Sequence, residues 1–135
     1  MPTFRIREAA ALLGVSDDTL RRWADAGRLA ASTGPDGRLV VDGAQLAAFA
    51  GELAVAPPAV GPIAGGSARN RFPGLVTRVV RDGVMAQVEL QAGPHRVVSL
   101  MSREAADELG LEPGVLAVAA VKSTAVVVEV PAGPR

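Results

Sequence analysis

Residues 54–66 constrain the fold more than any other segment, because they separate a helical pattern from a strand pattern. They read Ala-Val-Ala-Pro-Pro-Ala-Val-Gly-Pro-Ile-Ala-Gly-Gly and carry no charge. Proline removes backbone hydrogen-bond donors, and glycine loses much conformational entropy when it is ordered. Such a composition is typical of a linker that is stiff at its start and flexible at its end. We therefore predict an α+β chain of two small domains, residues 1–53 and 67–131, joined by this linker.

The overall composition excludes several classes of function. The 135 residues include 14 basic and 14 acidic side chains, so any DNA contact must come from a local patch. The absence of cysteine excludes disulfides and thiol chemistry and fits a cytoplasmic location. No signal peptide is visible, and no run of about 18–20 apolar residues would span a membrane. We expect a soluble cytoplasmic protein.

Catalytic signatures are also missing from the sequence. It contains no Ser/His/Asp set, no paired carboxylates in a cleft pattern and no glycine-rich phosphate loop. His95 is the single histidine and follows a Gly-Pro turn, so we interpret it as a surface residue and expect no metal site. An enzyme is the least expected class, and no catalytic cofactor is expected.

The N-terminal segment predicts the order helix, turn, helix, β-hairpin, helix. Periodic apolar residues over 7–13 favour a first helix, and Gly14 permits the left-handed backbone that ends it. Ser16 is a strong N-cap for a second helix. Residues 29–41 have the pattern of a hairpin, and Asp42 caps a third helix. The positions expected to face the core are Ile6, Ala9, Ala10, Leu13, Leu20, Trp23, Ala24, Leu46, Phe49 and Leu53.

The run Val15-Ser16-Asp17-Asp18-Thr19-Leu20-Arg21-Arg22-Trp23, followed by Gly27-Arg28-Leu29, resembles the winged helix-turn-helix of MerR-like and excisionase-like proteins. The resemblance covers residues 4–53. It implies that residues 16–26 form a recognition helix, that residues 33–38 form the wing tip, and that double-stranded DNA is the partner. The residues that it implies at the DNA are Ser16, Thr19, Arg21, Arg22 and Arg38.

Two of these features have a structural alternative. Arg21 and Arg22 can instead form a solvated face paired with the aspartates of their own helix. Trp23 is expected in the core rather than at the DNA.

A domain of about 50 residues has a thin core, and its few cations would bind DNA weakly. We therefore expect several copies to act together.

The C-terminal segment changes to an apolar period of two, which predicts strands. Asp82-Gly83 is a hairpin turn signal, and Ser102 is expected to open a short helix that ends at Leu109-Gly110. This helix lies between the third and fourth strands, which is the order of an OB-like barrel. The five predicted strands are residues 75–81, 84–91, 95–100, 115–121 and 125–130.

The last two predicted strands are apolar on both faces. Residues 115–121 carry only Val, Leu and Ala, and Val126-Val127-Val128 continue this character. One short helix cannot cover both faces, and an uncovered apolar face must meet another subunit or aggregate. We therefore expect a homo-oligomer that forms through the C-terminal domain.

Two separated runs, Ser67-Ala68-Arg69-Asn70 and Lys122-Ser123-Thr124, offer hydroxyls, backbone N–H groups and two cations without a carboxylate. This set suits a small oxyanion whose oxygens only accept hydrogen bonds. With Asp107-Glu108-Leu109-Gly110-Leu111, these runs resemble the Mop (molbindin, TOBE) domain over roughly residues 67–130. The resemblance implies molybdate or tungstate as ligand, held at subunit interfaces. The residues implied to bind it are Ser67, Ala68, Arg69, Asn70, Ser102, Lys122 and Ser123.

Each element of this site has an ordinary alternative. Ser67 and Asn70 can cap the start of a strand, and Arg69 can pair with Glu129. Residues 122–124 can form a simple hairpin loop. The joint occurrence of the motifs favours the oxyanion site.

The two halves together predict a DNA-binding transcriptional regulator that responds to molybdate or tungstate. One alternative is a cytoplasmic molybdate storage or homeostasis protein, whose N-terminal domain serves assembly or docking. In another, the C-terminal half is an inert oligomerisation barrel.

Overall fold

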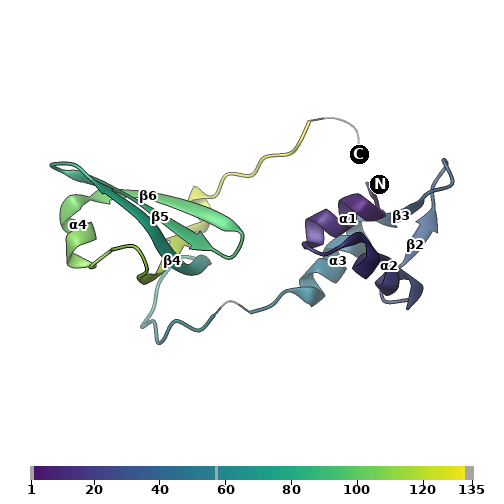
Figure 1. The fold of residues 1–135 in the computed structure, drawn as a ribbon, viewed down its shortest axis with the longest axis horizontal. Helices are drawn as coiled ribbons and strands as arrows, with labels where there is room; N and C mark the ends of the chain where they lie inside the picture. The colour runs from purple at the N-terminus through teal and green to yellow at the C-terminus, as the bar shows by residue number, and fades with distance from the viewer. Residues whose placement is uncertain (1, 57, 133–135) are drawn as a thin grey trace. The chain divides into compact units, whose positions relative to one another are not determined.

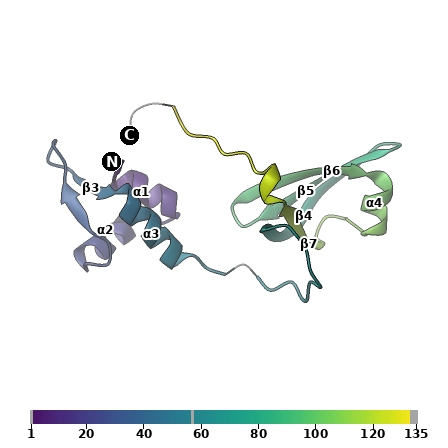
Figure 2. The same cartoon turned by 180° about the vertical axis from the view of Figure 1, so that it is seen from behind.

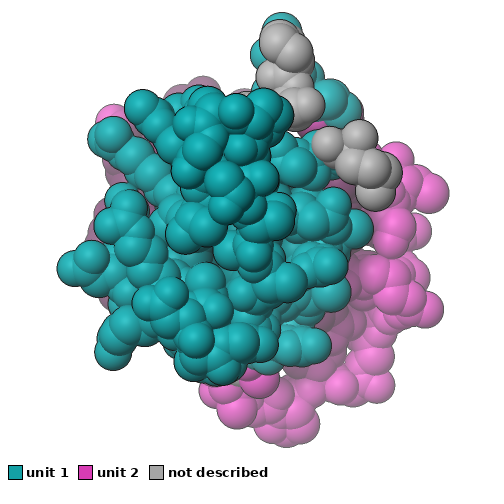
Figure 3. Space-filling model, turned by 90° about the vertical axis from the view of Figure 1, so that its right-hand side faces the viewer, with its two compact units in different colours: residues 1–55, 130–135 teal, residues 56–129 magenta. Residues whose placement is uncertain are grey.

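The computed structural model describes residues 2–56 and 58–132, which form two compact units (Figures 1 and 3). One unit consists of Met1–Val55 with Val130–Arg135, and the other of Ala56–Glu129. Three helices and a small sheet build the first unit. A curled antiparallel sheet with one short α-helix builds the second, so the predicted α+β class is confirmed.

The N-terminal unit has the predicted order of helices and hairpin. Its elements are β1 (Thr3–Arg5), α1 (Ile6–Leu13), α2 (Asp17–Asp25), β2 (Ala31–Thr33), β3 (Leu39–Asp42) and α3 (Gly43–Leu53). Strand β1 was not predicted. It pairs antiparallel with β3, placing Phe4 opposite Val41, and completes a three-stranded sheet in the order β1-β3-β2.

Local hydrogen bonds explain where the helices begin and end. Gly14 adopts φ 71° after α1, the left-handed conformation that glycine allows at a helix end. The Ser16 side chain accepts a hydrogen bond of 3.1 Å from the Thr19 backbone N–H at the start of α2. Asp42 likewise accepts one of 3.1 Å from Gln45 at the start of α3. The predicted caps at Ser16 and Asp42 are confirmed.

The core of this unit gathers residues from all three helices and the sheet, with Leu20 and Val41 fully buried. Trp23 packs against this core, and its ring meets that of Phe49 edge to face at 5.4 Å between centroids. The Arg28 guanidinium lies 5.3 Å from the centre of the Trp23 ring. Trp23 is therefore a core residue, as the sequence indicated.

The C-terminal unit contains β4 (Asn70–Arg81), β5 (Met85–Ala92), β6 (His95–Ser102), α4 (Arg103–Glu108), β7 (Leu116–Val121) and the 3₁₀ turn η1 (Ser123–Ala125). Its sheet is antiparallel with strand order β6-β5-β4-β7. Strand β4 pairs with β7 along its first half and with β5 along its second half (Figure 2). A strand shared in this way bends the sheet, as expected of an OB-like fold.

Gly74 lies where β4 passes from one partner to the other. A Cβ atom added at this position would lie 2.5 Å from the Gln91 carbonyl oxygen and 3.0 Å from the Ala92 Cα of β5. Both are backbone atoms that no side-chain rotation can move. The close approach of the two strands therefore requires glycine at this position.

The predicted fifth strand, residues 125–130, is wrong for the single chain. Residues 123–125 form η1 instead of a hairpin reversal, so the chain leaves the sheet rather than folding back along β7. Residues 126–130 belong to no strand, and Val127 and Val128 are 83% and 82% exposed. The described part of the unit thus has four strands, with β6 and β7 at its two edges.

Strand β5 departs from the predicted alternation at Glu89. A period of two places its side chain on the face opposite Val88 and Leu90, the more polar face of the strand, but the residue is only 7% exposed. Arg96 on β6 donates from Nε to Glu89 Oε1 at 2.6 Å, and Arg78 on β4 approaches Oε2 at 3.5 Å. These arginines compensate the buried charge, so one carboxylate links the three strands.

The predicted turn between β4 and β5 is confirmed at Asp82-Gly83. Asp82 Oδ1 accepts hydrogen bonds from the backbone N–H groups of Met85 at 2.7 Å and Val84 at 2.8 Å. These bonds, with the nearby charge of Arg103, lower the pKa of the Asp82 carboxyl. The ionised side chain therefore stabilises this turn at neutral pH.

Candidate functional site

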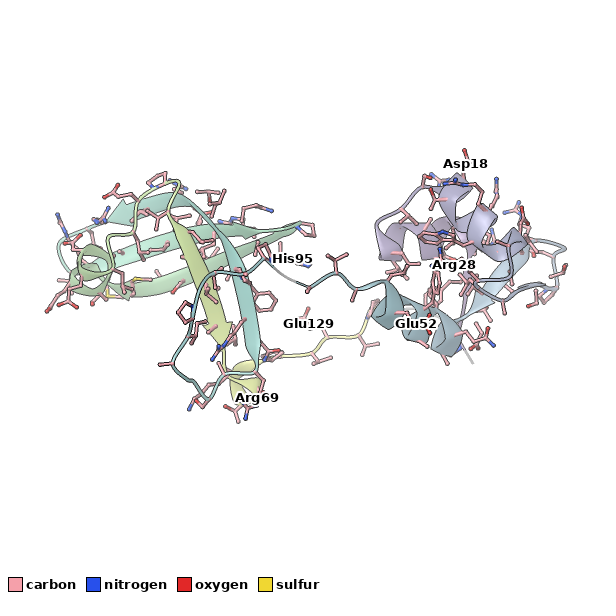
Figure 4. All side chains as sticks on the ribbon, turned by 90° about the horizontal axis from the view of Figure 1, so that it is seen from below. Asp18, Arg28, Glu52, Arg69, His95 and Glu129 are labelled. Carbon is pink, nitrogen blue, oxygen red and sulfur yellow. The ribbon has the colours of Figure 1, made fainter. Side chains whose placement is uncertain are left out.

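The structure brings the two predicted oxyanion-binding runs to one end of the sheet. Asn70 opens β4 opposite Val121, the last residue of β7, and its Nδ2 donates to the Val121 carbonyl oxygen at 3.1 Å. Lys122 and Ser123 follow directly after Val121, so they lie beside the run 67–70. Figure 4 shows Arg69 next to the yellow turn η1.

The polar groups at this end of the sheet are accessible. Ser67, Arg69, Lys122 and Ser123 are exposed, whereas Ala68 and Asn70 are half-buried. Within residues 2–56 and 58–132, neither Arg69 nor Lys122 forms an ion pair, so the alternative pairing of Arg69 with Glu129 is not made. The two cations can therefore face an anion without a competing carboxylate.

Ser102 does not join these residues in one chain. It ends β6 opposite Met85, at the other end of the sheet, and its Oγ accepts a hydrogen bond of 3.1 Å from Ala105 at the start of α4. A strand as long as β4 spans on the order of 30 Å between its ends. The structure thus gathers six of the seven predicted residues, namely Ser67, Ala68, Arg69, Asn70, Lys122 and Ser123, and leaves Ser102 apart.

The predicted DNA-contacting residues of α2 lie on its accessible side. Arg21 and Arg22 are exposed, and among the described residues neither pairs with an aspartate of the helix. Arg22 Nη2 instead donates to Thr19 Oγ1 at 3.2 Å, and Ser16 Oγ donates to the same atom at 2.9 Å. The start of α2 therefore presents a connected row of polar groups.

Arg21 and Arg38 share a cavity of about 480 Å³ with Arg5 and Arg7. The sequence did not single out Arg5 and Arg7 as DNA-contacting residues. Both flank Ile6, which is 5% exposed and packs into the core. An arginine on each side of a buried residue was the available signal, but its meaning depended on the unpredicted strand β1.

Asp36 lies at the wing tip next to two of these arginines. Arg5 Nη2 lies 3.0 Å from Asp36 Oδ2, and Arg38 Nε lies 4.0 Å from the same oxygen. The Arg38 backbone N–H donates to Asp36 Oδ1 at 3.1 Å. This hydrogen bond, assisted by the Arg5 and Arg38 charges, lowers the pKa of the Asp36 carboxyl, so Asp36 is negative at neutral pH.

Known proteins match both halves of the chain. Residues 66–128 match the family of the TOBE domain, and residues 3–53 match that of a helix-turn-helix domain. Molybdenum-pterin-binding protein 2 of Clostridium pasteurianum is 38% identical over 63 residues, which are 46% of this chain and 93% of that protein. The chain belongs to the TOBE-domain family.

Two solved structures are similar to about half of this TOBE-domain protein. A molybdate binding protein from Sporomusa ovata is 28% identical, with a TM-score of 0.47, and the match covers 48% of this chain and 97% of the other. MopII from Clostridium pasteurianum is 36% identical, with a TM-score of 0.46, and the match covers 49% and 100%.

The described residues offer neither a membrane-spanning helix nor a metal centre. No helix among residues 2–56 and 58–132 is long and apolar enough to cross a bilayer. In the same part of the TOBE-domain protein, no three His, Asp or Glu side chains gather where they would hold a metal ion.

Proposed function

We propose that this protein is a cytoplasmic transcriptional regulator that binds double-stranded DNA through residues 1–53 and senses molybdate or tungstate through residues 67–131. The observation that carries the proposal is the meeting of residues 67–70 with Lys122-Ser123 at one end of the β4–β7 pair. A helix-turn-helix domain shares the chain with this TOBE domain.

The gathered groups suit a tetrahedral dianion. Two hydroxyls, from Ser67 and Ser123, and two cations, from Arg69 and Lys122, are exposed at this end of the sheet. Molybdate and tungstate accept hydrogen bonds through four oxygens and donate none at neutral pH, so donors and positive charge favour them. The two anions have nearly the same shape and charge, so these donors suit both.

Assembly through the TOBE domain is part of the proposal. An apolar groove of about 450 Å³ lies between β6 and β7, the two edges of the curled sheet. Its lining includes Val97, Met101 and Ala119, while Val126–Val128 are exposed. We infer that this valine segment of one copy covers the groove of another, which removes both apolar surfaces from water.

Such assembly also explains the position of Ser102. In one chain it lies at the far end of the sheet from Asn70. Neighbouring copies can bring the α4 end of one sheet to the β4–β7 end of the next. The oxyanion would then be bound at an interface, and its binding would favour the assembled state.

An oligomer would in turn present several helix-turn-helix domains to one duplex. Linking weak binding modules raises their joint affinity well above that of one module.

Storage of molybdate is the second candidate function. It is supported by the relative molybdenum-pterin-binding protein 2. The match covers 93% of that protein but only 46% of this chain, so the relative has little sequence beyond the shared part.

Isothermal titration tests the oxyanion site. We expect wild-type protein to release or absorb heat on titration with molybdate but not with sulfate at the same concentration. Lys122→Ala should weaken molybdate binding about tenfold, because a charge-assisted contact is lost. Arg78→Ala removes a cation from the same domain, away from the site, and leaves Glu89 paired with Arg96, so it should bind as wild type does. Equal molybdate affinity in wild type and Lys122→Ala would contradict the site.

Duplex binding separates the regulator from the storage protein. We expect wild-type protein to bind a fluorescent 30-base-pair duplex with an affinity that falls as salt rises. The double substitution Arg21→Ala/Arg22→Ala should reduce this affinity about tenfold or more, measured by anisotropy. If wild-type protein binds no duplex at low salt, with or without molybdate, the storage function is favoured instead.

A further inference from the structure

The arginines of the helix-turn-helix domain are unevenly distributed. Residues 2–53 contain six arginines and seven acidic residues, so the domain as a whole is not basic. Four of the six arginines nevertheless line one cavity, which is completed by Ile6 and Leu39. They come from the β1–α1 junction, from α2 and from the wing, so the fold concentrates the positive charge of three separate segments.

The contacts of these four guanidinium groups leave much of their charge uncompensated. Among the described residues, Arg7 and Arg21 have no hydrogen-bond or ion-pair partner for their side chains, whereas Arg5 and Arg38 share Asp36. Among the described residues, Asp36 thus pairs with two of the four cations, and Arg7 and Arg21 have no carboxylate partner. Like charges that line one cavity repel one another, and an anion in the cavity relieves that repulsion.

We propose that this cavity binds a backbone phosphate of double-stranded DNA, with Arg5 and Arg7 acting beside Arg21 and Arg38. The inference rests on the proposed DNA-binding function and extends it to two residues outside the recognition helix and wing. A guanidinium donates two parallel hydrogen bonds to phosphate oxygens, so arginines suit this ligand. The phosphate contact fixes how α2 and the wing lie on the duplex.

Asp36 acts in this site as an internal competitor. Its carboxylate lies 3.0 Å from the Arg5 guanidinium, on the group that the phosphate would contact. DNA must displace this contact or share it. Asp36 therefore lowers the affinity for duplexes of any sequence, and removing its charge should raise that affinity.

The test measures how duplex affinity depends on salt. Each phosphate contact contributes about 0.9 to the slope of log affinity against log salt. We expect Arg7→Ala to weaken binding of a mixed-sequence 30-base-pair duplex several-fold and to reduce this slope by about 0.9 per bound copy. Arg78→Ala, which removes a cation from the TOBE domain, should change neither quantity.

Asp36→Asn should change duplex affinity in the opposite direction to Arg7→Ala while it preserves the wing. Asparagine keeps a side-chain oxygen for the Arg38 backbone N–H, so the turn should remain while the charge is removed. We expect duplex affinity to rise several-fold. Inorganic phosphate that replaces chloride at equal ionic strength should compete only weakly with the duplex. If millimolar phosphate abolishes duplex binding, the cavity is a site for free phosphate rather than for DNA.

The outcomes separate this inference from the proposed function. Duplex binding that depends on Arg21 and Arg22 but is unchanged in Arg7→Ala and Asp36→Asn would overturn the inference and leave the regulator intact. Wild-type protein that binds no duplex would overturn both. A lower salt slope in Arg7→Ala together with a tighter Asp36→Asn supports the phosphate site.

Discussion

Replacing Gly74 with alanine should destabilise the TOBE domain and leave the stability of the helix-turn-helix domain unchanged. The new methyl group would lie 2.5 Å from the Gln91 carbonyl oxygen, and the clash is with backbone. Relief requires β4 and β5 to separate where β4 changes partners. We expect a loss of about 2–3 kcal/mol, a large fraction of the stability of a small domain.

The single tryptophan makes this prediction easy to follow. Trp23 packs in the helix-turn-helix core, so its fluorescence reports on that domain alone during urea unfolding. Circular dichroism reports on both domains, and only this signal should show an earlier transition in Gly74→Ala. Gly83→Ala is the matched control, because no atom lies within 4 Å of a Cβ added there. Unchanged dichroism transitions in Gly74→Ala would show that β4 and β5 can move apart at little cost.

The sequence predicted the helix-turn-helix domain well because its boundaries depend on local chemistry. The serine and aspartate caps and the left-handed glycine act within a few residues, so Ser16, Asp42 and Gly14 placed the helix ends correctly. Strand β1 was missed because three residues carry too little periodicity. Its stability comes from pairing with β3, which lies more than thirty residues away.

The C-terminal domain shows the opposite limit. The β-branched valines of residues 125–130 do favour a strand. A strand also needs a partner, and no local rule identifies that partner. The 3₁₀ turn at Ser123–Ala125 directs this segment away from its own sheet. The candidate site shows the same limit. Strand pairing places Asn70 opposite Val121, directly before Lys122, whereas Ser102 lies at the other end of the sheet.

Replacing Val127 with aspartate should dissociate the assembled protein. Val127 is 83% exposed in one chain, so its substitution should not disturb the fold of that chain. In the proposed assembly its segment covers the apolar groove between β6 and β7, where a carboxylate would lose its hydration without gaining a partner. We expect the dissociation constant of the assembly to rise at least tenfold, measured by sedimentation or light scattering.

Val55→Asp is the matched control for this substitution. It introduces the same charge at a valine that is 90% exposed, but in the segment before the TOBE domain. It should leave the mass in solution unchanged. If Val127→Asp and wild type have equal mass, the valine segment does not hold the copies together. In the proposed assembly Ser102 reaches the oxyanion only between copies. Val127→Asp should therefore also bind molybdate more weakly, although it leaves Ser67, Arg69, Lys122 and Ser123 in place.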